Sequence, residues 1–192
     1  MSILIDILPE SIEINNKAYE VNSDFRTLIL LNLLLCDPQI DDANKVNQAL
    51  VLFYPIIPVD IDMAISKMAW FNRCGKEIEY KKIKSTKAPI GKRTLDYEKD
   101  ADLIYSAFMS QYKLDLQDIE DLHWWKFQSL LNGLKDDNKL CEIMGYRSKD
   151  LSKIKDKEER NFYKGMQDIY SLDDGFTLEE IEELEEEKNN WK

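Results

Sequence analysis

The residues that could carry out chemistry are few in this sequence. It contains one histidine, His123, beside two tryptophans, and a Ser-His-Asp or Cys-His nucleophilic site would have to use it. A lone histidine in an aromatic-rich segment is usually a packed, hydrogen-bonded side chain, and we interpret His123 in this way. The sequence has no P-loop, no dinucleotide-binding glycine motif, no H-E-x-x-H motif and no EF-hand loop. We therefore expect a protein that is not an enzyme, with no catalytic, cofactor-binding or metal-binding residues.

The three cysteines offer little further chemistry. Cys36, Cys74 and Cys141 are 38 and 67 residues apart, and no two of them form a C-x-x-C pair. This spacing fits neither a disulfide framework nor a zinc site, so we interpret them as reduced thiols. The N-terminal segment lacks a basic region and carries Asp6 within its apolar run, so we predict no signal peptide and expect a cytoplasmic protein.

The charge of the chain is unevenly distributed. Acidic residues number 37 against 26 basic ones over 192 residues, a net charge of -11, which argues against a nucleic-acid partner. Residues 76–93 nevertheless carry +5, and the tail from residue 173 onward carries -7. We interpret the first stretch as an exposed basic loop. An acidic amphipathic tail would be repelled by an anionic membrane, so we expect no membrane partner.

Apolar patterning predicts a mainly helical fold. Alternating residues predict strands over 3–8, 12–14 and 19–21, with Asn15-Asn16 as the turn of a hairpin. Helical periodicity and capping residues predict helices over 25–35, 41–54, 60–74, 97–112, 116–132, 140–144 and 155–170. In the helix at 155–170, we expect Phe162, Met166, Ile169 and Tyr170 to form the inner face.

The expected architecture is therefore a helical bundle of about six to seven helices with an N-terminal β-hairpin. We predict one helical domain over 1–172, which contains the hairpin (2–22) and the basic loop (76–93). The remaining residues, 173–192, are predicted to form an acidic helical tail, since Thr177 and Glu180 match a capping box.

One run of residues is unusually specific: Leu122, His123, Trp124, Trp125, Lys126 and Phe127. With this run, the chain resembles the bacteriophage gene product fifteen family, small proteins from the tail gene clusters of long-tailed phages and prophages of Gram-positive bacteria. Further matching segments lie at residues 19–26, 100–108, 112–116, 144–148 and 153–158, so the resemblance extends from the hairpin to about residue 172. We expect all six residues of the run to lie in the core.

The resemblance implies a role in tail assembly. The gene position of the family, between the major tail protein and the tape measure protein, belongs to tail assembly chaperones. It implies a chaperone that binds the tape measure protein in the host cytoplasm and is absent from the mature virion. The alternative is a structural tail-completion or connector component of the virion. The resemblance assigns no catalytic residues.

For the partner contact, the sequence suggests two surfaces. The first is the apolar face of the tail, which consists of Leu178, Ile181, Leu184 and Trp191. This face could instead fold back onto the protein's own core. The second is the basic loop, which includes Lys81, Lys82 and Lys84. If the loop of one copy meets the acidic tail of the next, we expect homo-oligomers that are sensitive to salt.

Overall fold

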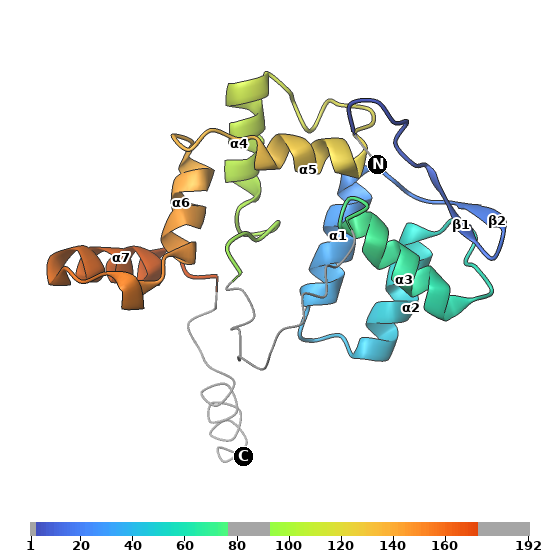
Figure 1. Ribbon diagram of the computed structural model, residues 1–192, viewed down its shortest axis with the longest axis horizontal. Coiled ribbons are helices and arrows are strands. Elements are labelled where there is room, and N and C mark those ends of the chain that lie inside the picture. Colours follow the sequence, from blue (N-terminus) through green and yellow to red (C-terminus); the bar gives the residue numbers. More distant parts are fainter. Residues whose placement is uncertain (1–2, 77–92, 173–192) are drawn as a thin grey trace, which may run out of the picture. The chain divides into compact units, whose positions relative to one another are not determined.

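The computed structural model describes residues 3–76 and 93–172 (Figure 1). These residues form a two-stranded antiparallel hairpin and seven α-helices, which confirms the predicted mainly helical fold with an N-terminal hairpin. None of the helices in these residues combines the length and the apolar character that a membrane span requires. The elements in chain order are β1 (Ser11–Ile14), β2 (Lys17–Glu20), α1 (Phe25–Cys36), α2 (Asp42–Phe53), α3 (Ile61–Asn72), α4 (Ala101–Tyr112), α5 (Trp124–Asn132), α6 (Lys139–Ser148) and α7 (Lys157–Ile169).

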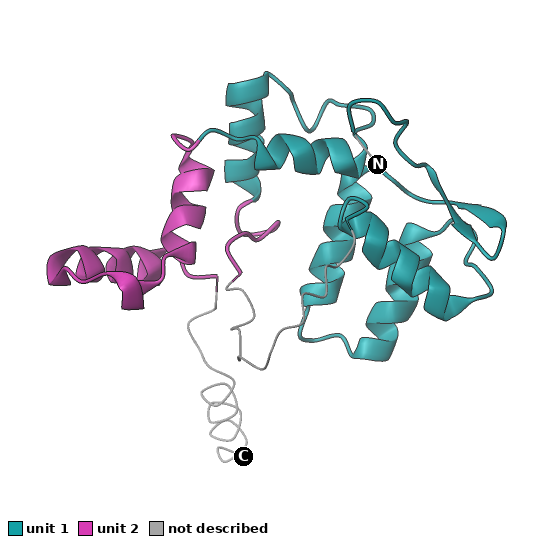
Figure 2. Ribbon diagram, viewed as in Figure 1, with its two compact units in different colours: residues 1–87, 101–135 teal, residues 88–100, 136–192 magenta. Residues whose placement is uncertain are grey.

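The chain divides into two compact units, which Figure 2 shows in different colours. Unit 1 comprises residues 1–87 and 101–135, and therefore holds the hairpin and α1 to α5. Unit 2 comprises residues 88–100 and 136–192, and holds α6 and α7. The patterning of the sequence contains no sign of this division, because residues 136–172 look as helical as the stretches before them.

The hairpin forms where the sequence predicts it. Ile12 pairs with Tyr19 and Ile14 with Lys17, across a two-residue turn. Asn15 and Asn16 have φ values of 51° and 62°, as a type I′ turn requires of both central residues. One face of the hairpin is buried in unit 1 and the other is exposed, as the alternation predicts.

The predicted strand over residues 3–8 is wrong. Residues 3–6 form turns and a bend, and the next three have no regular structure. A strand is stable only as part of a ladder, and the sheet of the described residues contains β1 and β2 alone. The alternating side chains of this segment are therefore left at the surface: Ile5 is 84% exposed and Ile7 is 93% exposed.

The first three helices begin at their predicted caps. Each is preceded by an aspartate whose side chain accepts a hydrogen bond from a backbone N–H of the first turn: Asp24, Asp41 and Asp60. The segment after α3 turns at Gly75, which has a φ of 72°. Caps of this kind involve residues two or three positions apart, which is why the sequence reveals them.

The fifth helix is shorter than predicted, because it begins at Trp124 and not near residue 116. The side chain of Arg26 donates hydrogen bonds to the carbonyl oxygens of Leu116 (3.0 Å) and Ile119 (2.7 Å). The N–H of Leu122 donates to the Asp24 carboxylate at 3.2 Å. These backbone groups are engaged by the start of α1, so the preceding residues form a turn and an extended segment.

Two further boundaries differ from the predictions. The fourth helix begins at Ala101 and not at residue 97, because the Asp96 carboxylate accepts the N–H groups of Glu98 and Lys99 and holds residues 97–100 in turns. The sixth helix runs through Gly145 to Ser148 and does not end at the glycine. Gly145 does not have the positive φ of a helix-ending glycine, so it is an ordinary interior position.

Candidate functional site

The residues predicted to contact a partner cannot be placed. All of them lie outside the described residues, so their roles stay predictions. These residues are Lys81, Lys82, Lys84, Leu178, Ile181, Leu184 and Trp191. The candidate site must therefore be built from the signature run, from the polar groups of unit 2 and from the surfaces of the described helices.

The two tryptophans of the signature join α5 to the end of α3. The indole N–H of Trp124 donates to the carbonyl oxygen of Asn72, and that of Trp125 to the carbonyl oxygen of Phe71, both at 2.9 Å. Carbonyl groups in the last turn of a helix lack an intrahelical partner, so the indoles act as a cap. A Cβ atom added to Gly75 would meet the Trp125 ring at 2.7 Å, so this close approach requires glycine.

His123 is the N-cap of α5. Its Nδ1 accepts the N–H of Trp125 at 3.1 Å, and its Nε2 lies 3.1 Å from the carbonyl oxygen of Pro9. These partners assign the proton to Nε2, which donates to Pro9. Burial lowers the pKa of His123, so the neutral ring is favoured. Both ring nitrogens are engaged in holding the backbone, which fits the structural interpretation of this histidine.

This arrangement predicts that stability depends on pH between neutral and mildly acidic values. The folded state favours neutral His123, so its contribution is fully present above the ordinary histidine pKa of 6.5 and is lost as the pH falls toward the lowered pKa. The expected slope of the free energy of unfolding is at most about 1.4 kcal/mol per pH unit. Urea unfolding between pH 7 and pH 5 measures it.

The matched control for this prediction is His123→Asn. Asparagine can cap a helix with its side-chain oxygen but does not titrate, so the slope should vanish while the protein stays folded. The chain has no other histidine to obscure the result. A slope that persists unchanged in His123→Asn would contradict the assignment.

Five of the six signature residues are buried, and one is not. Phe127 is fully buried and stacks on Phe25, Phe108 and Trp124, with ring centroids 4.9, 5.1 and 5.7 Å apart. Lys126 is exposed, so its expected place in the core is wrong. An ammonium group is costly to bury without an ionic partner, and its position on α5 turns it to solvent. Leu122, His123, Trp124 and Trp125 are buried as expected.

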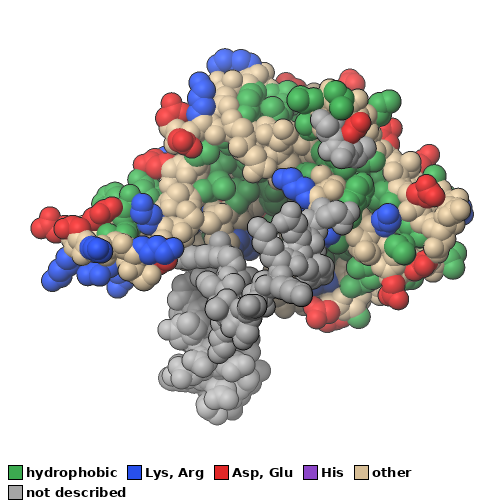
Figure 3. Space-filling model, viewed as in Figure 1, with side chains coloured by type: hydrophobic (Ala, Val, Ile, Leu, Met, Phe, Trp, Pro, Cys, Tyr) green, Lys and Arg blue, Asp and Glu red, His purple; other side chains and the backbone are tan. Residues whose placement is uncertain are grey.

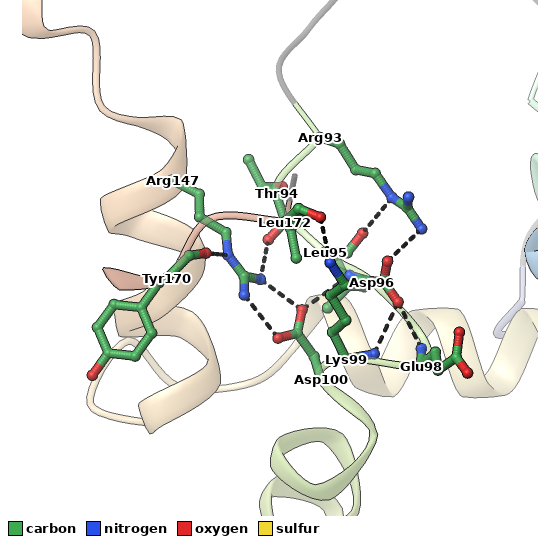
Figure 4. A network of polar contacts seen from close by, with 10 residues as sticks. All are labelled: Arg93, Thr94, Leu95, Asp96, Glu98, Lys99, Asp100, Arg147, Tyr170 and Leu172. Atoms are coloured by element: carbon green, nitrogen blue, oxygen red, sulfur yellow. Dashed lines mark hydrogen bonds and ion pairs between the residues drawn. The ribbon is translucent and has the colours of Figure 1, made fainter. Parts of the chain in front are cut away.

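A second buried arrangement, absent from the predictions, lies in unit 2 (Figure 4). The Arg147 guanidinium donates two hydrogen bonds to the Asp100 carboxylate, at 2.6 and 2.9 Å. It also donates to the carbonyl oxygens of Thr94 (3.0 Å) and Tyr170 (2.7 Å). The side chains of the pair are only 7% and 2% exposed. One arginine thus connects three separate stretches of unit 2.

Sequence reasoning missed this pair because its members are 47 residues apart and no local pattern links them. One signal was present in the composition. The chain has 21 lysines and only five arginines, and arginine is the residue whose planar fork matches a carboxylate with two parallel bonds. An arginine in such a lysine-rich chain is therefore a candidate for a buried ion pair.

The face of the seventh helix that was expected to be its inner one is only partly covered, since Met166 and Tyr170 are half-buried. Phe162 is 51% exposed and Ile169 is 67% exposed, and no residue of α7 is buried. The helix docks through a neighbouring face, where the Gln167 side chain donates to the carbonyl oxygens of Tyr146 and Lys149 at 2.9 and 2.8 Å. The rings of Phe162 and Tyr170 do contact Tyr146 of α6, with centroids 6.2 and 6.0 Å apart. The prediction is therefore wrong for Ile169, which is left at the surface beside these contacts.

The result is a partly exposed apolar stripe on a charged helix. Phe162, Met166 and Ile169 follow one another at helical spacings of four and three residues. In Figure 3, hydrophobic side chains lie on the surface over α7 between charged ones. A stripe of this spacing can pack against the apolar face of another helix.

The described residues offer few groups that are suited to catalysis or metal binding. Burial raises the pKa of the Cys74 thiol, which keeps it protonated near neutral pH. Within residues 3–76 and 93–172, no three His, Cys, Asp or Glu side chains are grouped so that they could hold a metal ion. The features that can be described are thus packing contacts, a buried ion pair and an apolar helix face.

Comparison with known proteins finds one family. The family model described as "Bacteriophage Gp15 protein" matches residues 4–172 of the chain. No curated protein and no solved structure matches the chain. The matched range contains the signature run, the Arg147–Asp100 pair and α7.

Proposed function

The chain belongs to the Bacteriophage Gp15 protein family, and from this membership we propose that it is a non-enzymatic phage tail assembly protein, a chaperone of the tape measure protein. The family match over residues 4–172 is the observation that carries the proposal. This role fits the gene position that the sequence resemblance implies, between the major tail protein and the tape measure protein. The protein would act in the host cytoplasm and leave before the virion is complete.

The surface of α7 supports this role. A tape measure protein is long and helical, and before assembly its apolar stripes are open to solvent. The partly exposed stripe at Phe162, Met166 and Ile169 can bury such a partner face, since helix-in-groove recognition uses anchors at these spacings. The charges on the rest of α7 and the net charge of -11 would keep the complex soluble. The apolar face of the acidic tail is a second proposed contact.

We expect Phe162→Asp and Ile169→Asp to weaken binding to a tape measure fragment at least about tenfold, because each buries an unpaired charge in the contact. The measurement is affinity by titration with the purified fragment. Asn161→Asp is the matched control, since it adds the same charge at an exposed position of α7 outside the stripe. Equal binding by all three variants and the parent would remove α7 from the contact.

Removal of residues 176–192 tests the tail in the same assay. A loss of binding would support the tail contact, and unchanged binding would count against it. Mass spectrometry of purified virions then separates the proposed role from its alternative. A chaperone is absent from the particle, whereas a tail-completion or connector protein is present in it.

A further inference from the structure

The outer edge of β2 has no strand beside it. The ladder pairs Lys17 and Tyr19 with β1 through hydrogen bonds, and the bond from Val21 N–H to the Glu10 carbonyl oxygen (3.0 Å) continues the same alternation. The N–H and C=O groups of Ala18 and Glu20 therefore point away from β1. Among the described residues, no strand other than β1 pairs with β2.

This edge opens onto a hollow. A surface cavity of about 250 Å³ is lined by the four residues of β2 together with Pro55 and Ile56. Its apolar part is formed by Tyr19 and by the segment after α2, where the Ile56 side chain is exposed. The strand β1 differs from β2 in that α3 contacts it. An extended segment added to β2 would thus find both backbone partners and an apolar wall.

The chain itself contains a segment that suits this edge. Residues 3–8 have the strongest strand pattern of the N-terminal region, with Ile3, Ile5 and Ile7 on one face, yet they belong to no strand. Ile5 and Ile7 are almost fully exposed. A β-patterned segment without a strand and a strand edge without a partner are therefore present in one molecule.

A strand that includes Leu8 cannot pair with β2 of the same molecule. Glu10 is bonded to Val21 within the hairpin, and β1 lies between Glu10 and the outer edge of β2. That edge strand would lie about 9.5 Å from β1, which is two strand spacings. The two residues from Leu8 to Glu10 span at most about 7 Å. A strand that includes Leu8 can reach the edge only from another molecule.

We propose that residues 3–8 of one copy add as a third strand to the outer edge of β2 in a second copy. The Ala18 and Glu20 backbone groups would pair with this strand, and its isoleucine face would cover the hollow at Tyr19 and Ile56. This is recognition by strand addition, in which main-chain hydrogen bonds give affinity and alternate side chains give specificity. It is independent of the proposed binding to the tape measure protein.

Sedimentation velocity of the full chain over a range of concentrations is the first test. We expect concentration-dependent association that resists added salt, because the contact is made by backbone and apolar groups. Ile5→Asp with Ile7→Asp should weaken the association at least about tenfold, as charges would enter the hollow. The control is Leu30→Asp, which likewise places an aspartate on an exposed apolar residue, in α1, and should leave association intact.

The edge itself is tested by Ala18→Pro. Proline removes only the outward N–H of Ala18 and leaves the hairpin bonds to β1, so the far-ultraviolet circular dichroism should not change. A labelled synthetic peptide of residues 1–10 should bind the Ile5→Asp, Ile7→Asp chain and fail to bind when Ala18→Pro is added. If Ala18→Pro prevents folding, Ala18→Lys in the same assay replaces it, since a lysine on a strand edge blocks pairing.

Three results would overturn the proposal. The first is a chain that stays monomeric at every concentration. The second is association that survives the two N-terminal aspartates. The third is association abolished by salt, which would instead favour the contact between the basic loop and the acidic tail. None of these results bears on the titration with the tape measure fragment, so the two proposals fail separately.

Discussion

Replacing Arg147 by alanine is expected to lower the free energy of unfolding by about 3–5 kcal/mol. The substitution leaves the Asp100 carboxylate buried without its cation, and it removes the donors from the carbonyl oxygens of Thr94 and Tyr170. Both effects fall on unit 2. For a chain of this length, each kcal/mol corresponds to about 2–4 °C in the midpoint of thermal unfolding, so we expect a fall of about 10 °C.

The matched control is Lys153→Ala. Lys153 and Asp150 form an ion pair at 3.3 Å, but their side chains are 82% and 49% exposed. Pairs of this kind contribute about 0–1 kcal/mol, so the control should unfold nearly as the parent does. If Arg147→Ala and Lys153→Ala had the same small effect, the buried pair would not hold unit 2 together.

A second variant tests the geometry of the pair. Arg147→Lys keeps the charge but has no planar fork, so it cannot make two parallel bonds to Asp100 and also reach both carbonyl oxygens. We expect it to restore only part of the lost stability. Replacing both members, as in Arg147→Met with Asp100→Leu, should cost less than the Arg147→Ala change alone, since no charge is then left unpaired.

Phe127→Ala is expected to have a comparable effect on unit 1, a loss of about 3–5 kcal/mol. Phe127 is fully buried, and its ring stacks on those of Phe25, Phe108 and Trp124. Truncation removes these contacts and leaves a cavity that the neighbouring rings cannot fill without moving. Urea unfolding followed by tryptophan fluorescence measures the loss.

Phe162→Ala provides the control with the same chemical change. Phe162 is half exposed on α7, so its truncation should cost less than about 1 kcal/mol. The same variant should weaken binding to the tape measure fragment if α7 forms the contact. Equal destabilisation by Phe127→Ala and Phe162→Ala would mean that α7 belongs to a core, and the proposed binding surface would be withdrawn.

The elements that the sequence alone determined are those governed by neighbouring residues. The Asn15-Asn16 turn needs two residues that tolerate positive φ. The caps at Asp24, Asp41 and Asp60 need a carboxylate within reach of the next turn. The aromatic character of the signature run was likewise sufficient to predict burial for most of its members and to indicate the family.

Other features were decided only by the tertiary structure. The start of α5 depends on Arg26, which engages carbonyl groups 90 and 93 residues further along the chain. The Arg147–Asp100 pair joins residues 47 positions apart, and the exposed part of α7 depends on where Gln167 finds its acceptors and on which rings Tyr146 contacts. The hydrophobic period of a helix shows that it has an apolar face, but it does not show which face finds a partner. Local rules describe interactions over a few residues, whereas these outcomes depend on which distant groups the folded chain brings within hydrogen-bonding distance.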